Sequence, residues 1–361
     1  MDFDLAQYLS AGIEQLVKDA LRVTLKNPKQ SAFFLSFAAA SQKAAKRRQE
    51  FEQAGEHIPS FLIASITDNC NLHCAGCYAK ANRLRVASPE LPLAAWERIF
   101  DEAEALGVSV ILLVGGEPLL RRDVLEAAAR RSGILFPVFT NGVLPDDSAL
   151  RMFERHRNLA PIISMEGDEN ATDARRGPGV YLRITELMRR LRERGLLFGA
   201  SVTVTSENLV TVTGSAFLDE LKRAGCKVVL FVEYVPVEQP ALALDEESRN
   251  ILAARIDELR IKQKGMIIIS FPGDEAESGG CLAAGRGFFH ISTIGDAEPC
   301  PFSPYSDVNL LNVSLREALK SPLFTRLREE GILAAEHSGG CVLFEQKETV
   351  AKLAGSPEGK S

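Results

Sequence analysis

Short apolar runs alternate with amphipathic segments between residues 61 and 237, and this alternation constrains the fold of the chain most strongly. Each run is rich in β-branched or aromatic residues and has the length of a strand that is buried on both faces. The predicted strands are 61–66, 108–114, 134–139, 160–165, 197–204 and 228–235. The predicted helices between them are 93–106, 121–132, 147–157, 180–195 and 215–224. Six such units predict an α/β fold, a partial (β/α)6 TIM-like barrel that stays open because eight units are not present.

Residues able to do chemistry follow the predicted strands at their carboxyl ends. The cysteine-rich segment 66–80 follows the first strand, and Gly115-Gly116-Glu117-Pro118 follows the second. Thr140-Asn141-Gly142 and Ser164–Gly167 end the third and fourth strands. Because parallel barrels carry their active sites at this end, we expect one functional site there.

The cysteine-rich segment carries three thiols in the spacing C-x3-C-x2-C, at Cys70, Cys74 and Cys77. Thiolate ligands select zinc, copper(I) or iron–sulfur clusters. A closed zinc site needs four ligands, and no fourth cysteine or suitable histidine follows at short range. His73 lies between two of the cysteines, where binding a metal would strain the loop. Three ligands leave one metal corner open, so we favour an iron–sulfur cluster over structural zinc or simply buried cysteines.

This spacing resembles the signature of the radical S-adenosylmethionine (SAM) enzymes, and the glycine loop 115–118 resembles the SAM-binding loop of that family. Tyr78 follows the last cysteine, whereas the family more often has its aromatic residue before that cysteine, where this chain has Gly76. The resemblance implies a 4Fe–4S cluster that binds SAM. One electron then cleaves SAM to methionine and a 5′-deoxyadenosyl radical, which abstracts hydrogen from a substrate. It also implies an electron donor such as a flavodoxin or a ferredoxin.

The resemblance further implies which residues bind SAM at the glycine loop and at the third strand end. Gly115 and Gly116 would let the backbone approach the ligand and accept its amino group. Glu117 is expected to fix the loop rather than contact SAM. Thr140 and Asn141 offer polar groups for a ribose, with a simple turn as the alternative.

Ser164-Met165-Glu166-Gly167 resembles an S-x-D-G motif of peptide-modifying members, with Glu166 in place of the aspartate. Ser164 would bind the ribose or the methionine carboxylate. Asp173 and Arg176 match the aspartate and arginine that follow this motif, so Arg176 is expected to hold the SAM carboxylate. Arg175 is the alternative in register, and a solvated charged loop is the alternative without function.

A second set of cysteines follows the barrel. Cys281, Gly295 and Cys300 form the pattern C-x13-G-x4-C, which resembles the start of the auxiliary-cluster domain called SPASM, or of its shorter form, twitch. Cys341 is the expected third ligand. The four further cysteines of a full SPASM domain are missing, so the resemblance implies one auxiliary 4Fe–4S cluster. His337, an outside ligand or the substrate could complete it; ordinary buried cysteines or a zinc site are the alternatives.

Other polar residues receive weaker assignments. Cys226 begins a buried strand and is expected to be structural, and His290 is expected to be packed. Side chains expected on the substrate side are Glu233, Tyr234, Arg286 and Tyr305.

The predicted divisions of the chain are a helical extension (1–58), the barrel (59–240), a helical linker (241–269), a small twitch-like or SPASM-like α/β domain (270–346) and a tail (347–361). Phe33, Phe34 and Phe37 are expected to pack the extension on the barrel, with contact to a membrane surface or to a partner as the alternative.

Composition limits the functions further. A net charge of −6 argues against nucleic-acid binding. The seven cysteines and the absence of a predicted signal peptide or membrane span favour a reducing cytoplasm. The substrate is interpreted as a peptide or protein side chain, with a tetrapyrrole, a lipid or a small cofactor precursor as alternatives. The rival class is a non-catalytic iron–sulfur protein that carries electrons or senses redox state, which the glycine loop and Arg176 disfavour.

Overall fold

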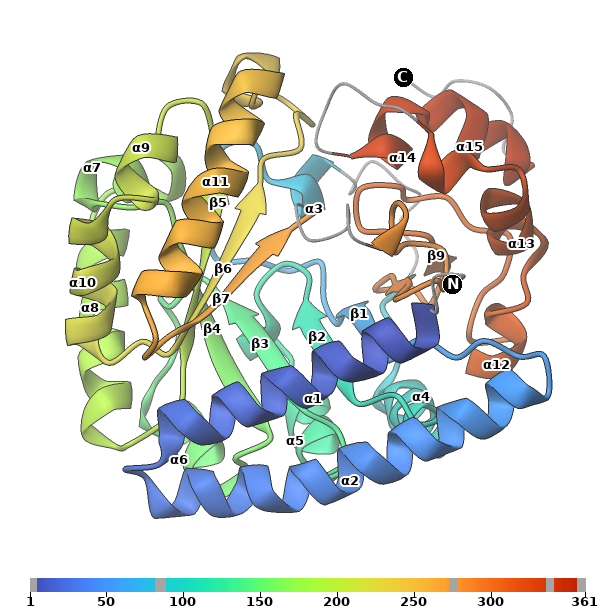
Figure 1. Ribbon diagram of the computed structural model, residues 1–361, viewed down its shortest axis with the longest axis horizontal. Coiled ribbons are helices and arrows are strands. Elements are labelled where there is room, and N and C mark those ends of the chain that lie inside the picture. Colours follow the sequence, from blue (N-terminus) through green and yellow to red (C-terminus); the bar gives the residue numbers. More distant parts are fainter. Residues whose placement is uncertain (1–4, 82–88, 273–277, 336–340, 356–361) are drawn as a thin grey trace.

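The computed structural model describes residues 5–81, 89–272, 278–335 and 341–355. At its centre lies one sheet with the strand order β7-β6-β5-β4-β3-β2-β1-β8-β9 (Figure 1). Strands β1 to β7 run parallel to their neighbours, as the alternation predicted. The strand bounds are β1 Phe61–Ser65, β2 Val110–Val114, β3 Phe136–Thr140, β4 Leu159–Met165, β5 Gly199–Val204, β6 Val228–Glu233, β7 Ile267–Phe271, β8 His290–Ile291 and β9 Ala297–Glu298.

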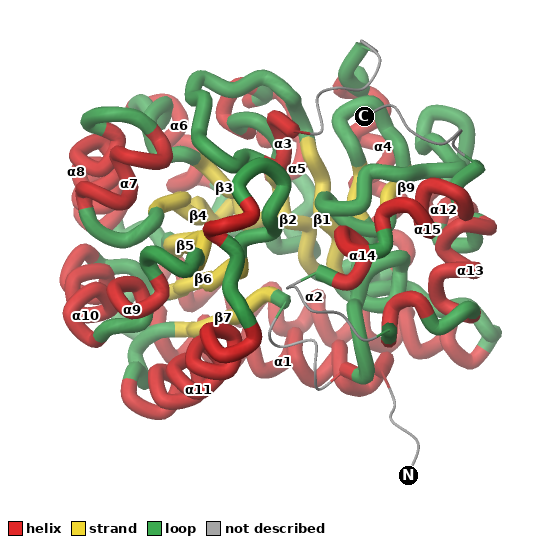
Figure 2. The backbone as a smooth tube through the Cα atoms, turned by 90° about the horizontal axis from the view of Figure 1, so that it is seen from above, coloured by secondary structure: helices red, strands yellow, loops and turns green. Residues whose placement is uncertain are grey.

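Helices surround these strands, with α8 and α10 at one end of the sheet and α12, α13 and α15 at the other (Figure 2). Local signals set the helix ends: Asp146 and Asp245 cap two helices with their side chains, and Gly107 ends another in the left-handed conformation. The helix bounds are α1 Leu5–Thr24, α2 Pro28–Gln53, α3 Tyr78–Ala81, α4 Leu93–Leu106, η2 Pro118–Leu120, α5 Arg122–Ala129, α6 Asp147–Arg155, α7 Glu169–Arg176, α8 Val180–Glu193, α9 Leu209–Val212, α10 Ser215–Ala224, η3 Pro240–Leu242, α11 Glu246–Lys262, α12 Leu315–Ala318, α13 Pro322–Glu329, η5 Ile332–Ala334, α14 Val342–Glu345 and α15 Lys347–Leu353.

The α1–α2 hairpin closes the floor of the barrel. Phe34 and Phe37 are buried in a cluster that includes Val110 and Ile267, the first residues of β2 and β7. Phe33 is partly buried against the same cluster. The prediction that these aromatic side chains pack on the barrel is therefore confirmed, and the apolar side of the hairpin faces protein. Within the described part of the chain, every helix is too short or too polar to span a bilayer.

The inner wall of the barrel is apolar and open to solvent. Along β6, Val229 and Phe231 face the helices and are fully buried, whereas the alternate residues Leu230 and Val232 are only half-buried. The same alternation recurs in three other strands. The half-buried inner residues of those strands are Leu112, Val114, Pro137, Phe139, Ile269 and Phe271. A bound molecule that reaches this wall would therefore meet mainly hydrocarbon side chains.

Two parts of the sheet differ from the prediction. The range expected to be a helical linker contains α11 but ends in β7, which pairs in parallel with β6. The hairpin β8–β9 extends the barrel sheet, because β8 pairs in parallel with β1. The ring of Phe288, just before β8, contacts the rings of Phe61 in β1 and Phe271 in β7. These aromatic contacts close the seam between the first and last strands of the barrel.

Candidate functional site

The cysteine loop lies directly on the glycine loop. Gly116 donates its backbone N–H to Thr67 O at 2.7 Å, and Glu117 donates its own to Asn69 O at 2.8 Å. A Cβ atom on Gly115 would lie 2.4 Å from Thr67 O, and one on Gly116 would lie 2.1 Å from Asn69 O. Both glycines are thus required by the close approach of two protein backbones, whereas the sequence suggested the approach of a ligand.

Glu117 fixes this loop, as its sequence position suggested. Its buried carboxylate accepts the hydroxyl of Thr140 at 2.9 Å and the backbone N–H groups of Asn141 and Leu119 at 2.8 and 3.1 Å. Burial raises the pKa of Glu117, and these hydrogen bonds oppose the rise. The carboxylate therefore ties the end of β2 to the end of β3.

Thr140 belongs to a turn, whereas Asn141 contacts the cysteine loop. The Thr140 hydroxyl donates to Glu117 and accepts the N–H of Gly142, which is the turn alternative. The side-chain amide of Asn141 donates to Asn71 Oδ1 at 2.8 Å and lies 3.8 Å from Cys70 Sγ. Asn141 can therefore orient the first thiol of the cysteine loop.

A buried ion cluster lies beside the cysteine loop at the end of β4. Arg176 donates Nε and Nη2 to the Glu166 carboxylate at 2.6 and 2.8 Å, and Arg175 donates Nη1 to it at 2.5 Å. Burial alone would raise the pKa of Glu166, but the charges of both guanidinium groups hold it below its usual range. Residues 173–176 form the last turn of α7, which Asp168 caps, so the solvated-loop alternative is wrong.

The same helix holds the middle of the cysteine loop. Arg175 accepts the backbone N–H of Ala75 on its carbonyl at 3.0 Å and donates Nε to Ala75 O at 3.0 Å. Nearby, the inward-facing Ser164 is half-buried and has no hydrogen-bond partner among the described residues. Its hydroxyl is available to a ligand.

The three thiols of the cysteine loop lie close enough to influence one another. Burial raises the pKa of Cys70 and of Cys74, and the charge of Cys77 raises both further. The charges of Arg176 and Arg175 oppose the rise at Cys74. In the described ranges, no three histidine, cysteine or carboxylate side chains converge closely enough for a single metal ion. Three separate thiols on one loop fit a polynuclear iron–sulfur cluster, which binds through thiolates.

The second set of cysteines also gathers. Burial raises the pKa of the Cys300 thiol strongly, and so do a hydrogen bond to Cys341 and the nearby charges of Cys341 and Cys281. Arg286 supports this site by donating to the backbone carbonyls of Cys281 and Ser278 at 2.7 and 2.9 Å. The guanidinium of Arg286 thus binds protein backbone, which differs from its predicted place on the substrate side. His337, a candidate fourth ligand, lies outside the described residues.

Aromatic and polar contacts join the two cysteine sets. Tyr78, next to Cys77, has its ring centroid 5.1 Å from that of Phe302, two residues after Cys300. Buried His290 lies 2.8 Å from Ser65 Oγ through Nε2 and 2.8 Å from Glu298 Oε2 through Nδ1. His290 is therefore packed, as expected.

Of the other residues with a predicted role, some lie where the sequence suggested and others do not. Cys226 is buried and its thiol donates to Val228 O, in agreement with a structural role. Glu233 shares the helix-facing side of β6 with Phe231, and its carboxylate lies 3.8 Å from Arg249 of α11. This helix-facing position differs from the predicted place of Glu233 on the substrate side. Burial raises the pKa of Glu233 to about 7, against the opposing charge of Arg249.

Tyr234, the next residue, faces inward and packs on Gly76 of the cysteine loop. Tyr305 is partly buried against the apolar core. Sequence reasoning missed Glu90, which accepts the Thr67 hydroxyl at 2.7 Å and the Asp68 N–H at 2.8 Å. It also missed Glu238, whose carboxylate accepts the backbone N–H of Gly76. Contacts between residues this far apart in the sequence leave no local pattern.

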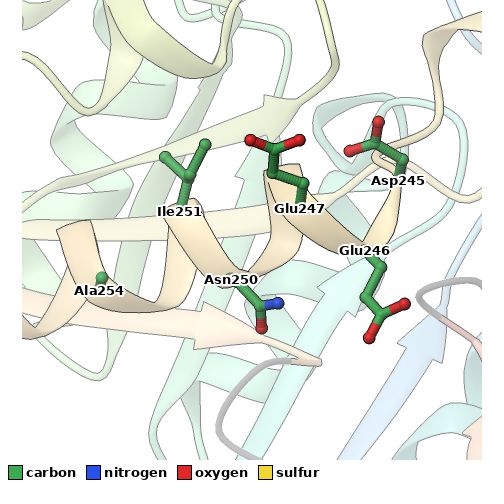
Figure 3. Close-up of a pocket in the computed structure, with 6 residues that line it drawn as sticks. All are labelled: Asp245, Glu246, Glu247, Asn250, Ile251 and Ala254. Carbon is green, nitrogen blue, oxygen red and sulfur yellow. The ribbon is translucent and has the colours of Figure 1, made fainter.

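A surface hollow of about 680 Å³ lies along α11. Its lining side chains come from that helix and from its N-cap residue (Figure 3), and none of them belongs to the predicted site. They are Asp245, Glu246, Glu247, Asn250, Ile251 and Ala254.

Residues 64–212 match the family model described as the radical SAM superfamily. The matched range holds the cysteine loop, the glycine loop and the ion cluster of Glu166. The chain is a radical SAM enzyme. Its likeness to other members extends well beyond the matched range.

Two curated relatives of this radical SAM enzyme cover much of the chain. It is 27% identical over 323 residues to the AdoMet-dependent heme synthase of Methanosarcina barkeri. That alignment covers 82% of this chain and 91% of the relative. It is 29% identical to the PqqA peptide cyclase of Granulibacter bethesdensis over 67% of each chain. The fold resembles the crystal structure of Streptococcus suis SuiB bound to precursor peptide SuiA, with a TM-score of 0.64, 19% identity, and coverage of 80% of this chain and 71% of SuiB.

Proposed function

We propose that this radical SAM enzyme binds SAM at a 4Fe–4S cluster held by Cys70, Cys74 and Cys77. A reduced cluster held there would supply the one electron that cleaves SAM to methionine and a 5′-deoxyadenosyl radical, and that radical would take a hydrogen atom from the substrate. The observation that carries the proposal is the convergence of three thiols, the glycine loop and a buried guanidinium at the carboxyl ends of β1, β2 and β4.

The ion cluster supports a role for Arg176 in holding the SAM carboxylate. Glu166 takes the Nε and Nη2 edge of this guanidinium, and among the described residues no hydrogen bond engages Nη1. A guanidinium carries five N–H donors in a rigid plane, so a ligand carboxylate can bind the remaining edge. Glu166 would then orient Arg176, and Ser164 would supply a hydroxyl beside it.

We further infer that Cys281, Cys300 and Cys341 hold one auxiliary 4Fe–4S cluster. The mutual effect of the three thiols on the pKa of Cys300 supports this set, since they come from distant parts of the sequence. The contact of Tyr78 with Phe302 and that of His290 with Ser65 of β1 would keep the two clusters in a fixed relation.

The apolar inner wall supports a substrate that presents a neutral hydrocarbon group to the barrel. Val232 and Ile269 belong to the half-buried side chains of this wall. An aliphatic or aromatic side chain of a peptide or protein fits that description, and the likeness to a PqqA peptide cyclase favours it. A tetrapyrrole is the second candidate, because a relative named for heme synthesis aligns along 91% of its length.

The test is anaerobic reconstitution followed by a SAM-cleavage assay. We expect 5′-deoxyadenosine from the wild-type protein under reducing conditions and none from Cys74→Ala. Cys226→Ala is the matched control, because that thiol is buried away from both cysteine sets. An intact cluster that cleaves no SAM would instead support a non-catalytic iron–sulfur protein.

A further inference from the structure

The loop that follows β6 reaches the cysteine loop from the far part of the barrel. In the sheet, β6 is separated from β1 by β5, β4, β3 and β2. Glu238 in this loop accepts the backbone N–H of Gly76 on its carboxylate at 3.0 Å. The hydroxyl of Tyr234 accepts the N–H of Gln239 at 3.3 Å, which folds the loop back on itself. The contact therefore spans the mouth of the barrel.

Tyr234 fills the space where a side chain at position 76 would lie. A Cβ atom on Gly76 would stand 2.6 Å from the Tyr234 hydroxyl oxygen and 2.9 Å from its ring carbon Cε2. Gly76 also has a φ of +62°, a left-handed conformation that glycine adopts without strain. Tyr234 itself is only 3% exposed, so its ring is held between the barrel and the cysteine loop.

Two different elements thus hold consecutive residues of the cysteine loop. Arg175 of α7 pairs with both backbone groups of Ala75, and Glu238 with Tyr234 holds Gly76. These two residues lie between Cys74 and Cys77. Their backbone directions decide where both thiols point, because only two residues separate the cysteines.

We propose that Tyr234 and Glu238 are positioning residues for the cysteine loop. They fix residues 75–76 from the β6 side, so that Cys74 and Cys77 present their thiolates in the arrangement that binds SAM at the cluster. The proposal rests on the proposed function for the cluster, but the clamp itself acts on protein backbone. It can therefore be tested with and without the cluster.

The first test measures amide hydrogen exchange across residues 70–78 in the cluster-free protein. We expect roughly tenfold faster exchange in Glu238→Ala and in Tyr234→Ala, because a hydrogen bond to a charged group or a packed ring is lost. Glu238→Gln keeps a hydrogen-bond acceptor and Tyr234→Phe keeps the ring, so the exchange rates of these two variants should stay near that of the wild type. Glu247→Ala, an exposed acid on α11, is the matched control. Unchanged exchange in both alanine variants would overturn the clamp.

The second test titrates SAM into the reconstituted, reduced protein and follows the electron paramagnetic resonance (EPR) spectrum. We expect Glu238→Ala and Tyr234→Ala to keep their iron but bind SAM roughly tenfold more weakly, with recovery in Glu238→Gln. Wild-type SAM affinity in both alanine variants would overturn the positioning role. A wild-type protein that binds no SAM would overturn the proposed function instead, whatever the exchange experiment gives.

Discussion

At the residue scale, the buried ion cluster of Glu166 with Arg175 and Arg176 is the feature most sensitive to substitution. The Glu166 side chain is 3% exposed. Its charge compensates those of Arg175 and Arg176, whose side chains are 18% and 10% exposed. Breaking a buried ion pair costs far more than the pair contributes, because an uncompensated charge stays behind in the interior. Glu166 should therefore matter for stability as well as for the orientation of Arg176.

We predict that Glu166→Gln lowers the free energy of unfolding by about 3–5 kcal/mol, measured by urea denaturation of the cluster-free protein under reducing conditions. The matched control is Glu186→Gln, which breaks an exposed pair with Arg189 and should leave the free energy of unfolding close to that of the wild type. Equal losses in the two variants would contradict the role assigned to Glu166.

The raised pKa of Glu233 predicts that its contribution to the stability of the folded protein falls as the pH rises. Its pKa rises from 4.5 to about 7 in the folded protein, so the folded state binds the proton more tightly than the unfolded state. The stability that Glu233 contributes is thus present below pH 4.5 and is lost as the pH rises through 7. We expect Glu233→Gln to be roughly 2–3 kcal/mol more stable than the wild type at pH 8, a difference that shrinks towards zero at pH 4.5.

This experiment compares urea midpoints at pH 8 and at pH 4.5. Glu247→Gln serves as the control, since it changes an exposed carboxylate on the same side of the barrel. A gap between Glu233→Gln and the wild type that is the same at both pH values would contradict the assignment.

At the element scale, most strands and helices were predictable because each carries its own local signal. The six predicted strands match β1 to β6 with ends shifted by up to two residues. Strand β7 was missed because its short run Ile267–Phe271 follows a long charged helix that was read as a linker. Helix α7 was missed because the polar segment after Asp168 has no apolar stripe, although an N-cap and an acidic first turn were present.

Contacts between distant parts of the sequence were harder to predict than the elements themselves. The β8–β1 pairing joins residues more than two hundred positions apart, and no local pattern specifies it. The face of Glu233 could have been predicted, since Glu233 and Tyr234 are consecutive in an extended segment and must point to opposite sides. The cysteine and glycine loops were predictable because their chemistry lies in short motifs, whereas Glu90, Tyr234 and Glu238 reach them from distant elements.

The floor of the barrel yields a stability prediction for an element. Phe37→Ala in α2 removes a fully buried ring that packs against strand ends and should lower the free energy of unfolding by about 3–5 kcal/mol. Leu35→Ala in the same helix removes a side chain that is 62% exposed and should change it by less than about 0.5 kcal/mol. Thermal or urea unfolding checks both values, and a small loss for Phe37→Ala would contradict the packed floor.

At the scale of the whole molecule, the two cysteine sets belong to one continuous structure. The auxiliary hairpin shares the barrel sheet through β8, and Tyr78 contacts Phe302 across the junction. The loss of solvent around the hydroxyl raises the pKa of Tyr78, and so do the charges of Cys77, Cys300 and Glu298. One aromatic residue therefore lies near thiols of both sets.

Iron and sulfide analysis tests the two-cluster account. We expect about eight irons per reconstituted chain, and about four after Cys281, Cys300 and Cys341 are all changed to alanine. Circular dichroism of the triple variant checks that the fold survives. A wild-type content of about four irons would contradict the auxiliary cluster while leaving the SAM site intact.

The account depends above all on an open cluster corner that SAM occupies. The most direct measurement is the low-temperature EPR spectrum of the reduced Cys281→Ala, Cys300→Ala, Cys341→Ala protein, recorded before and after SAM is added. With only the Cys70, Cys74 and Cys77 cluster present, we predict that SAM shifts the g-values of the signal. A spectrum that SAM leaves unchanged would contradict the proposed chemistry.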